Sequence, residues 1–404
     1  MMKTTLLLLA LAGCFPTRSA ELACDVTTDC EAGRTCQTGF CVAAEVDAGI
    51  EDDADTSDAD SFDCTKLQGR QFAGCDLPRP DPALELGIAG TYTYNTDTGT
   101  LVDPSGTTAT PANKDLPPGK VISVESFTLA AGATLRVTGA KPLIIAAFST
   151  ISIAGVIDAG STPTELGAGA NPGDCSAHAS LAGQSTNDGA GGGGGGSRGG
   201  AGGRGGQGGG GQGGTGGVAL TAAPLLLGGC PGAAGGVGDA ANNNGAGGGG
   251  GGAIQLTAAE SITITGTITT GGAGGGPAAS SDGGGGGGGS GGMIGLESAT
   301  VTIDPTAILA ANGGGGGGGS GSNAALPGAN GLASAVRANG GQGNNGGNGG
   351  LGSAATIING NTGNNDGDGG GGGGGAAGFV VLSSTAPAQL QGATVSPAAT
   401  LVAR

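Results

Sequence analysis

Few side chains in this 404-residue sequence could carry acid–base or nucleophilic catalysis. His178 is the only histidine, so any Ser–His–Asp site would need it, and no nucleophile elbow is apparent. Polysaccharide lyases and hydrolases need carboxylates, or a carboxylate with Lys or Arg, that converge on one site. From residue 167 onward there are nine acidic and four basic residues, and Glu297 and Asp304 have no obvious partner. We therefore predict no catalytic residue, no cofactor and no metal site, and we interpret His178 as a solvated loop residue.

The N-terminus has the pattern of an export signal. Lys3 supplies a positive charge, and the apolar run Leu6–Leu11 is too short to span a bilayer, which takes about 20 residues. The run ends in Leu-Ala-Gly-Cys at Cys14, which resembles the lipobox of bacterial lipoproteins. The resemblance implies removal of residues 1–13 and lipidation of Cys14, with a membrane as partner. Phe15, rather than the Asp that retains enteric lipoproteins at the inner membrane, favours the outer membrane. An ordinary signal peptide with an unrelated cysteine is the alternative.

The cysteines that remain after Cys14 number eight, and an even number in an exported chain indicates disulfides. We expect Cys64 to pair with Cys75, and Cys175 with Cys230 inside a glycine-rich insertion. Cys24, Cys30, Cys36 and Cys41 fall in a segment too small to build a core, so disulfides must hold it.

The segment 24–42 resembles the four-cysteine modules near the N-terminus of secreted lipoproteins from myxobacteria and their relatives. Its three pairings stay open. A zinc site is the alternative, but the C-x₂-C spacing that zinc prefers is missing.

Residues 45–63 contain nine Asp or Glu and no Lys or Arg, which predicts an extended, solvated tether. Calcium binding is the alternative for the string DDADTSDAD, but the Gly and the later Glu of the calcium loop are absent. The formal net charge of −17 argues against nucleic acid as a partner.

Short strands are expected beyond residue 120, after a hairpin over residues 90–103. Three stretches, 145–160, 256–271 and 296–313, share apolar residues at alternate positions and then a Gly or Pro that breaks the strand. Alternation should turn Ile153, Ile264 and Ile303 inward. The repeats resemble right-handed parallel β-helices, so we predict an all-β fold, a β-solenoid with long Gly-rich insertions. A β-sandwich is the alternative fold.

Hydroxyl side chains flank a β-branched residue in each repeat. If the repeats stack, two rows form, from Thr150, Ser152, Ser261, Thr263, Thr300 and Thr302. A weaker fourth copy places Thr394-Val395-Ser396 in the same position. The rows resemble the Thr-x-Thr rows of β-helical antifreeze proteins, which would make them a flat face for glycan or ice. A solvated face that only favours β structure is the alternative.

The glycine runs allow two interpretations. Glycine costs the most backbone entropy to order, so the runs could be flexible loops. The segment GGAGGRGGQ at 199–207 instead suits a three-residue helix of the polyproline II type that packs closely against its neighbours.

We therefore expect a membrane-anchored surface or envelope protein with a structural or adhesive role, whose partner is an extracellular polysaccharide or envelope polymer. A carbohydrate-active enzyme is the alternative. The expected parts are a signal peptide (1–13), a lipidated tether (14–23), a disulfide-rich module (24–42), an acidic linker (43–63), a disulfide loop and hairpin (64–120) and the Gly-rich solenoid (121–404).

Overall fold

The computed structural model describes residues 34–37, 40–43, 62–220, 226–390 and 392–403. The chain divides into two compact units, Met1–Ser61 and Phe62–Arg404. In the first unit, β1 (Arg34–Gln37) and β2 (Phe40–Ala43) pair antiparallel, with Cys36 opposite Cys41. Cys14, Cys24 and Cys30 lie outside the described residues. Within the described part of the chain, no helix is long and apolar enough to cross a membrane.

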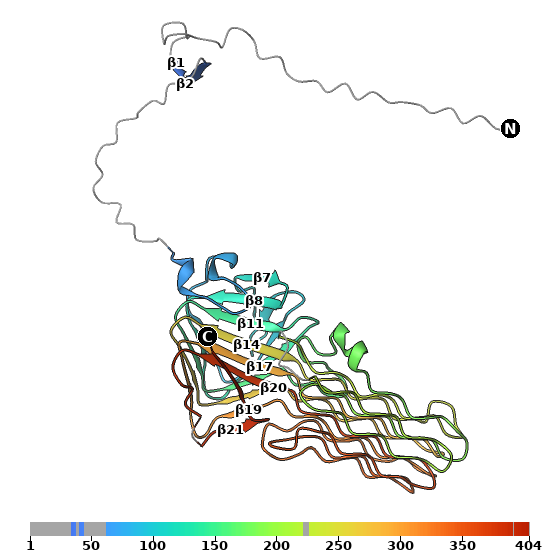
Figure 1. Cartoon of the computed structure of the whole chain (residues 1–404). Coiled ribbons are helices and arrows are strands. Elements are labelled where there is room, and N and C mark those ends of the chain that lie inside the picture. The colour runs from blue at the N-terminus through green and yellow to red at the C-terminus, as the bar shows by residue number, and fades with distance from the viewer. Residues whose placement is uncertain (1–33, 38–39, 44–61, 221–225, 391, 404) are drawn as a thin grey trace, which may run out of the picture. The chain divides into compact units, whose positions relative to one another are not determined.

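Three sheets of mostly parallel strands form the strand-bearing part of the second unit (Figure 1). The seven-stranded sheet has the order β22 (Thr400–Ala403), β20 (Phe379–Ser384), β17 (Met293–Ser298), β14 (Ala253–Ala258), β11 (Leu143–Ala147), β8 (Gly119–Val124), β7 (Asn113–Leu116). The five-stranded sheet has the order β18 (Thr300–Ile303), β15 (Ser261–Ile264), β12 (Thr150–Ile153), β9 (Phe127–Leu129), β3 (Leu84–Leu86). The eight-stranded sheet has the order β21 (Thr394–Ser396), β19 (Ile308–Ala310), β16 (Thr267–Thr269), β13 (Val156–Asp158), β10 (Ala133–Thr138), β4 (Gly90–Asn95), β5 (Thr100–Val102), β6 (Thr108–Ala109).

Antiparallel pairing joins β7 to β8, and it joins β4, β5 and β6 in succession, which confirms the predicted hairpin. The helical elements among the described residues of the second unit are short 3₁₀ turns, η3 (Cys64–Lys66), η4 (Gly74–Asp76) and η5 (Gly173–His178).

Each sequence repeat sends its three strands to the three sheets in the same order. The strands β11, β12 and β13 belong to the seven-, five- and eight-stranded sheets, and the next two repeats follow the same path. The bend between β12 and β13 requires glycine, because a Cβ on Gly155 would lie 2.3 Å from the Ala133 carbonyl oxygen. One apolar cluster takes inward side chains from all three sheets, including the fully buried Ile153 and Ile264.

The fold is nearly all β, but the predicted right-handed parallel β-helix is wrong. Within the described residues of the second unit the strands form three separate, mostly parallel sheets that do not close into a barrel or a solenoid. The chain leaves the strands after β13 and returns only at β14, having passed through glycine segments that hydrogen-bond to one another. Successive repeats are therefore not joined by short turns. Three mostly parallel sheets do not match the alternative β-sandwich either.

The glycine-rich segments are ordered by hydrogen bonds between their backbones. In residues 284–289, successive N–H groups donate in turn to three different neighbouring segments. The pairs are Gly284 to Gly236, Gly285 to Gly370, Gly286 to Gly276, Gly287 to Ala233, Gly288 to Gly373 and Gly289 to Ala273. A period of three residues, with every bond made to a neighbour, is that of a polyproline II helix. Of the two interpretations of these segments, the structure has the ordered one.

The packed glycine-rich segments are called the glycine body below. Four of its all-glycine runs are buried throughout: 191–196, 283–289, 313–319 and 369–375. The run 283–289 donates to three neighbours and accepts from three others, for example from Gly193, Gly248 and Gly317. A Cβ on Gly287 would lie 2.0 Å from the Gly194 carbonyl oxygen, a distance that real Cβ atoms essentially never show. Glycine is therefore required in these runs by the close approach of neighbouring backbones.

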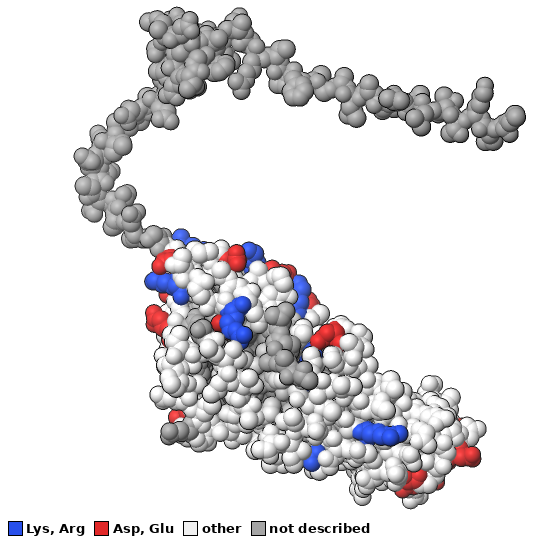
Figure 2. Space-filling model, in the orientation of Figure 1, with Lys and Arg blue, Asp and Glu red and all other residues white. Residues whose placement is uncertain are grey.

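Asparagine side chains complete the hydrogen bonding where the glycine body meets solvent. The Oδ1 atoms of Asn359 and Asn365 accept from the N–H groups of Ala201 and Gln207, each at 2.8 Å. The Oδ1 atom of Asn348 accepts from the N–H of Gly343 at 2.8 Å. These side chains replace the backbone carbonyls that a further neighbouring segment would supply. Charged side chains are sparse on the face drawn in Figure 2, where most of the surface over the glycine segments is white.

Candidate functional site

The predicted hydroxyl side chains lie in two rows across the five-stranded sheet. The first row is Thr150, Ser261 and Thr300, and the second is Ser152, Thr263 and Thr302, each in direct register on neighbouring parallel strands. Neighbouring strands are about 4.8 Å apart, and alternate residues of one strand about 6.6 Å apart. The two rows therefore form a regular array.

Alternation along the strands turns this array to the outside. In β15, Ile262 and Ile264 are fully buried, whereas Thr263 between them is exposed. Ser152 is also exposed and Thr302 is half-buried. The rows are thus present as predicted, and their role in binding stays a prediction.

Two further members of the second row were missed. Thr128 of β9 lies opposite Ser152, and Glu85 of β3 lies opposite Thr128. Thr128 is exposed between the buried Phe127 and Leu129. The signal was present in the sequence, because Phe-Thr-Leu has the same alternation as Ile-Ser-Ile.

The expected fourth copy, Thr394-Val395-Ser396, is wrong. These residues form β21, which pairs with β19 in the eight-stranded sheet. The five-stranded sheet is extended instead by an isolated bridge between Thr302 and Gln389. The tripeptide pattern alone did not distinguish the sheets, because both use short strands that alternate apolar and hydroxyl residues.

The six predicted hydroxyl side chains on β12, β15 and β18 offer uncharged donors and acceptors, whereas Glu85 on β3 places a carboxylate at the end of the second row. Each hydroxyl group supplies one donor and two acceptor sites, which suits a ligand that carries many hydroxyl groups of its own. A carboxylate lies just past β18, where Asp304 accepts from the N–H and the hydroxyl group of Thr306. These two hydrogen bonds hold the pKa of Asp304 below its ordinary value. Asp304 therefore stabilises a turn as an ionised carboxylate.

The other residues considered for catalysis lie apart. Glu297 is buried in the seven-stranded sheet, where it accepts from the N–H of Arg70 and from Gln255. His178 ends η5, is half-buried, and accepts from the Ser197 hydroxyl group through its backbone carbonyl. Among the side chains that the structure describes, no three His, Cys, Asp or Glu residues are grouped so as to hold a metal ion.

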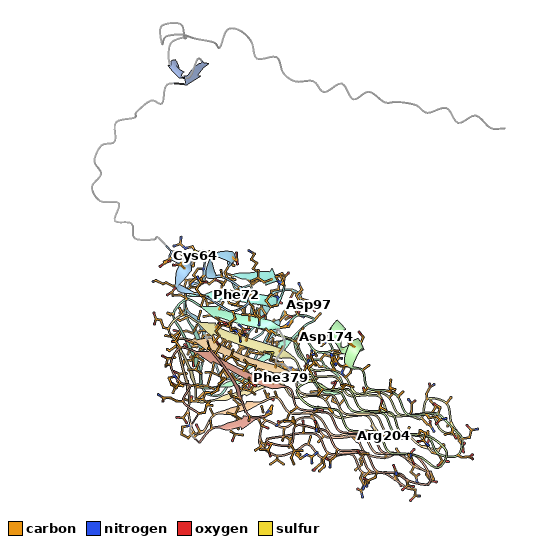
Figure 3. The ribbon with its side chains drawn as sticks, in the orientation of Figure 1. Cys64, Phe72, Asp97, Asp174, Arg204 and Phe379 are labelled. Carbon is orange, nitrogen blue, oxygen red and sulfur yellow. A yellow bond between two sulfur atoms is a disulfide. The ribbon has the colours of Figure 1, made fainter. Side chains whose placement is uncertain are left out.

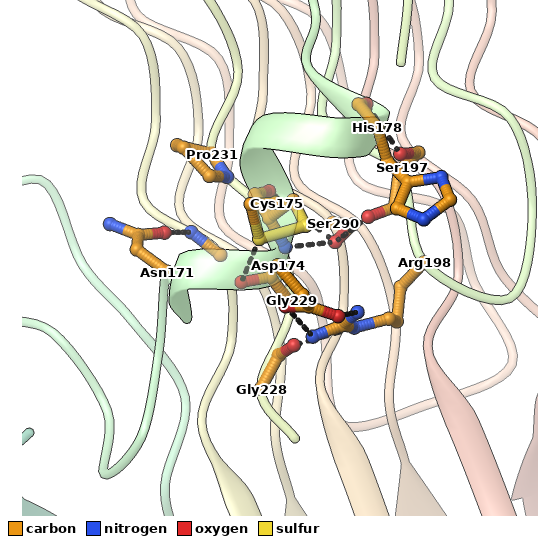
Figure 4. Close-up of a disulfide and its surroundings, with 12 residues drawn as sticks. Asn171, Asp174, Cys175, His178, Ser197, Arg198, Gly228, Gly229, Pro231 and Ser290 are labelled. Carbon is orange, nitrogen blue, oxygen red and sulfur yellow. Dashed lines mark hydrogen bonds and ion pairs between the residues drawn. A yellow bond between two sulfur atoms is a disulfide. The ribbon is translucent and has the colours of Figure 1, made fainter. Parts of the chain in front are cut away.

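The structure contains two of the predicted disulfides. Cys64 is bonded to Cys75, and Cys175 to Cys230, which joins η5 to the glycine body (Figure 4). Beside the second disulfide, the fully buried Arg198 donates to both carboxylate oxygens of Asp174, at 2.8 and 3.3 Å, and to the Gly228 carbonyl at 2.6 Å. A buried guanidinium requires such pairing, so this group fixes η5 against the glycine body.

The chain matches no family model, and neither a curated protein nor a solved structure matches it. The functional argument therefore rests on the geometry of the residues themselves.

Proposed function

We propose that this protein is a non-catalytic, lipid-anchored surface or envelope protein of a bacterium that binds an extracellular polysaccharide or another envelope polymer. The observation that carries the proposal is the register of the hydroxyl rows, since Ser152, Thr263 and Thr302 repeat on adjacent strands. A repeating ligand can make the same contact at each strand. The lipid at Cys14 and the acidic tether at residues 43–63 would hold the binding face away from the membrane, at the outer membrane of the cell.

The buried apolar cluster beneath the hydroxyl rows suits a role in adhesion. Strands packed on a fully buried apolar cluster hold the hydroxyl groups at fixed spacing, which lowers the entropy lost on binding. Tethered copies on one cell would also bind a polymer at many points, so weak individual contacts add up to strong attachment.

A carbohydrate-active enzyme would need carboxylates that converge on one cleft. Glu297 and Asp304, the two acids near the strands of the third repeat, have different positions and partners. Glu297 is hydrogen-bonded in the seven-stranded sheet, and Asp304 caps a turn beyond the five-stranded sheet. This separation favours binding without turnover.

The test is co-sedimentation of the purified protein with insoluble cellulose, chitin and peptidoglycan sacculi. We expect binding to at least one polymer, with no soluble sugar released. Thr263→Lys should abolish that binding, because the longer, charged side chain projects from the second row between Ser152 and Thr302. The matched control is Thr91→Lys, at an exposed position of β4 in the eight-stranded sheet, which should bind like the wild type. Absence of binding by the wild type, or equal loss in both variants, would contradict the proposal.

A further inference from the structure

A cavity of about 240 Å³ opens on the outer face of the seven-stranded sheet, which faces away from the shared apolar cluster. Strands β14, β17, β20 and β22 supply its floor, and Arg70 and Gln71 of the Cys64–Cys75 loop lie at its edge. Elsewhere this outer face packs in an apolar cluster that includes Leu67 and Phe72; Figure 3 labels Phe72 near Cys64. The cavity is thus not filled by the loop that covers the neighbouring strands.

The hollow exists because β17 has a glycine at its third position. Gly295 lies between Gln255 and Val381 in the sheet register. A Cβ on Gly295 would make only ordinary contacts, the nearest being the Gln255 Cγ at 3.4 Å. Packing therefore does not require glycine here, in contrast to the buried glycine runs. Glycine weakens a strand and often marks a place where a ligand approaches the backbone.

Polar side chains surround the hollow although the sheet buries them. Glu297 is 3% exposed and accepts from the N–H of Arg70 at 2.9 and 3.1 Å and from Gln255 Nε2 at 3.2 Å. Ser383, opposite Glu297 in the register, is 2% exposed, and its hydroxyl group has no hydrogen-bond partner among the described residues. The Oε1 atom of Gln71 likewise has none in the described structure.

Attachment of the loop to the sheet explains part of this arrangement. The hydrogen bonds from Arg70 to Glu297 serve that purpose. Attachment does not explain the missing side chain at Gly295 or the unsatisfied hydroxyl group of Ser383. Buried polar groups are normally hydrogen-bonded, and a ligand in the hollow would supply the missing partners.

The side chains that line the cavity indicate the chemical class of ligand that it fits. The side chains of Met293, Val381 and Val402 present an apolar surface, while Gln71 and Ser383 need partners. The ligand must therefore combine hydroxyl or amide groups with a C–H face. Arg70 disfavours a cation and Glu297 an anion. At about 240 Å³ the cavity is smaller than the roughly 300–1,000 Å³ of drug-sized sites, which fits a single ring.

The geometry points to a binding pocket for one neutral sugar residue, built around Gly295, Glu297 and Ser383. It lies on a different sheet from the hydroxyl rows, so it does not depend on the proposed polymer-binding face.

The test uses the full-length protein and four probes, D-glucose, D-galactose, D-mannose and N-acetyl-D-glucosamine, each titrated alone by calorimetry and by ligand-observed NMR. We expect saturable binding of at least one. Gly295→Val should fill the hollow, leave Tm equal or higher, and weaken binding by about tenfold or more, which is a loss of at least one good contact. The matched control is Gly87→Val, where no atom lies within 4 Å of the new Cβ; it should bind normally.

Ser383→Ala provides a second test, because it removes only the hydroxyl group and adds no atom to the packed strand. It should weaken binding severalfold with an equal or higher Tm, because it removes a buried hydroxyl group that has no partner in the described structure, and this holds even if the Gly295 variant folds poorly. Thr263→Lys should lose polymer binding and keep monosaccharide binding, which separates failure of this pocket from failure of the proposed function. The pocket is overturned if the wild type binds none of the four sugars, if it binds methylguanidinium or acetate instead, or if both pocket variants bind like the wild type.

Discussion

Replacing one interior glycine with alanine distinguishes an ordered glycine body from flexible loops. Gly287 is buried in the run 283–289, and its new Cβ would lie 2.0 Å from the Gly194 carbonyl oxygen. Because real Cβ atoms essentially never lie within 3.0 Å of such an atom, the segments that carry Gly287 and Gly194 must separate by about 1.0 Å. That separation lengthens the two hydrogen bonds that join these segments, from the N–H of Gly193 to Gly285 and from the N–H of Gly196 to Gly288, which are now 2.9 and 2.8 Å.

The energetic cost follows from these two bonds. Lengthened by about 1 Å they would exceed the 2.7–3.2 Å range of N–H···O bonds. Each buried group left unsatisfied costs about 1–3 kcal/mol, which gives about 2–6 kcal/mol for the pair. Alanine has fewer conformations than glycine in the unfolded chain, and this difference stabilises the folded state by about 0.4–1 kcal/mol. We therefore predict that Gly287→Ala lowers the free energy of unfolding by about 1–5.5 kcal/mol.

The assay is urea unfolding followed by circular dichroism. Gly367→Ala is the matched control, because no atom lies within 4 Å of its new Cβ, and it should be neutral or slightly stabilising. A flexible-loop model predicts the same small effect for both substitutions. If Gly287→Ala is as stable as Gly367→Ala, the packed arrangement of the glycine runs is refuted.

Three further predictions concern the core, the disulfide and the anchor. Ile264→Asp places an unpaired charge at a fully buried position and should unfold the domain. Thr263→Lys should change the free energy of unfolding by no more than about 0.5 kcal/mol. Equal loss of thermal stability in both variants would refute the assignment of Ile264 to the inside and Thr263 to the outside. Replacing both Cys175 and Cys230 with Ser opens a loop of sequence separation 55 and should lower the free energy of unfolding by about 4 kcal/mol through loop entropy. An unchanged midpoint of urea unfolding would contradict this prediction. Cys14→Ala should move the protein from the membrane fraction to the soluble exported fraction, and unchanged lipid labelling of that variant would exclude this anchor.

The strand pattern was predictable because it depends on local alternation. The buried Ile153, Ile264 and Ile303 and the outward Ser152 and Thr263 follow from a period of two residues. The sheet arrangement was not predictable, because the tripeptide pattern at 394–396 fits two different sheets, and the connections between repeats run through the glycine body.

The glycine body was predictable only as one of two alternatives. A run of glycines has no side chains to report which neighbours it contacts, so order or disorder depends on backbone bonds between distant segments. The spacing of Asn359 and Asn365, six residues apart, fits the three-residue period and was a usable signal. The hollow at Gly295 was hidden, because one glycine in β17 looks unremarkable among 99.

Photo-crosslinking tests the central proposal most directly. A polymer that co-sediments with the protein would be given a photoreactive group, bound, irradiated and mapped by mass spectrometry of the linked peptides. We predict crosslinks within β12, β15 and β18, their loss in Thr263→Lys, and no shortening of the polymer during incubation. Crosslinks confined to the other sheets or to the glycine body, or release of polymer fragments, would contradict binding by the hydroxyl rows without turnover.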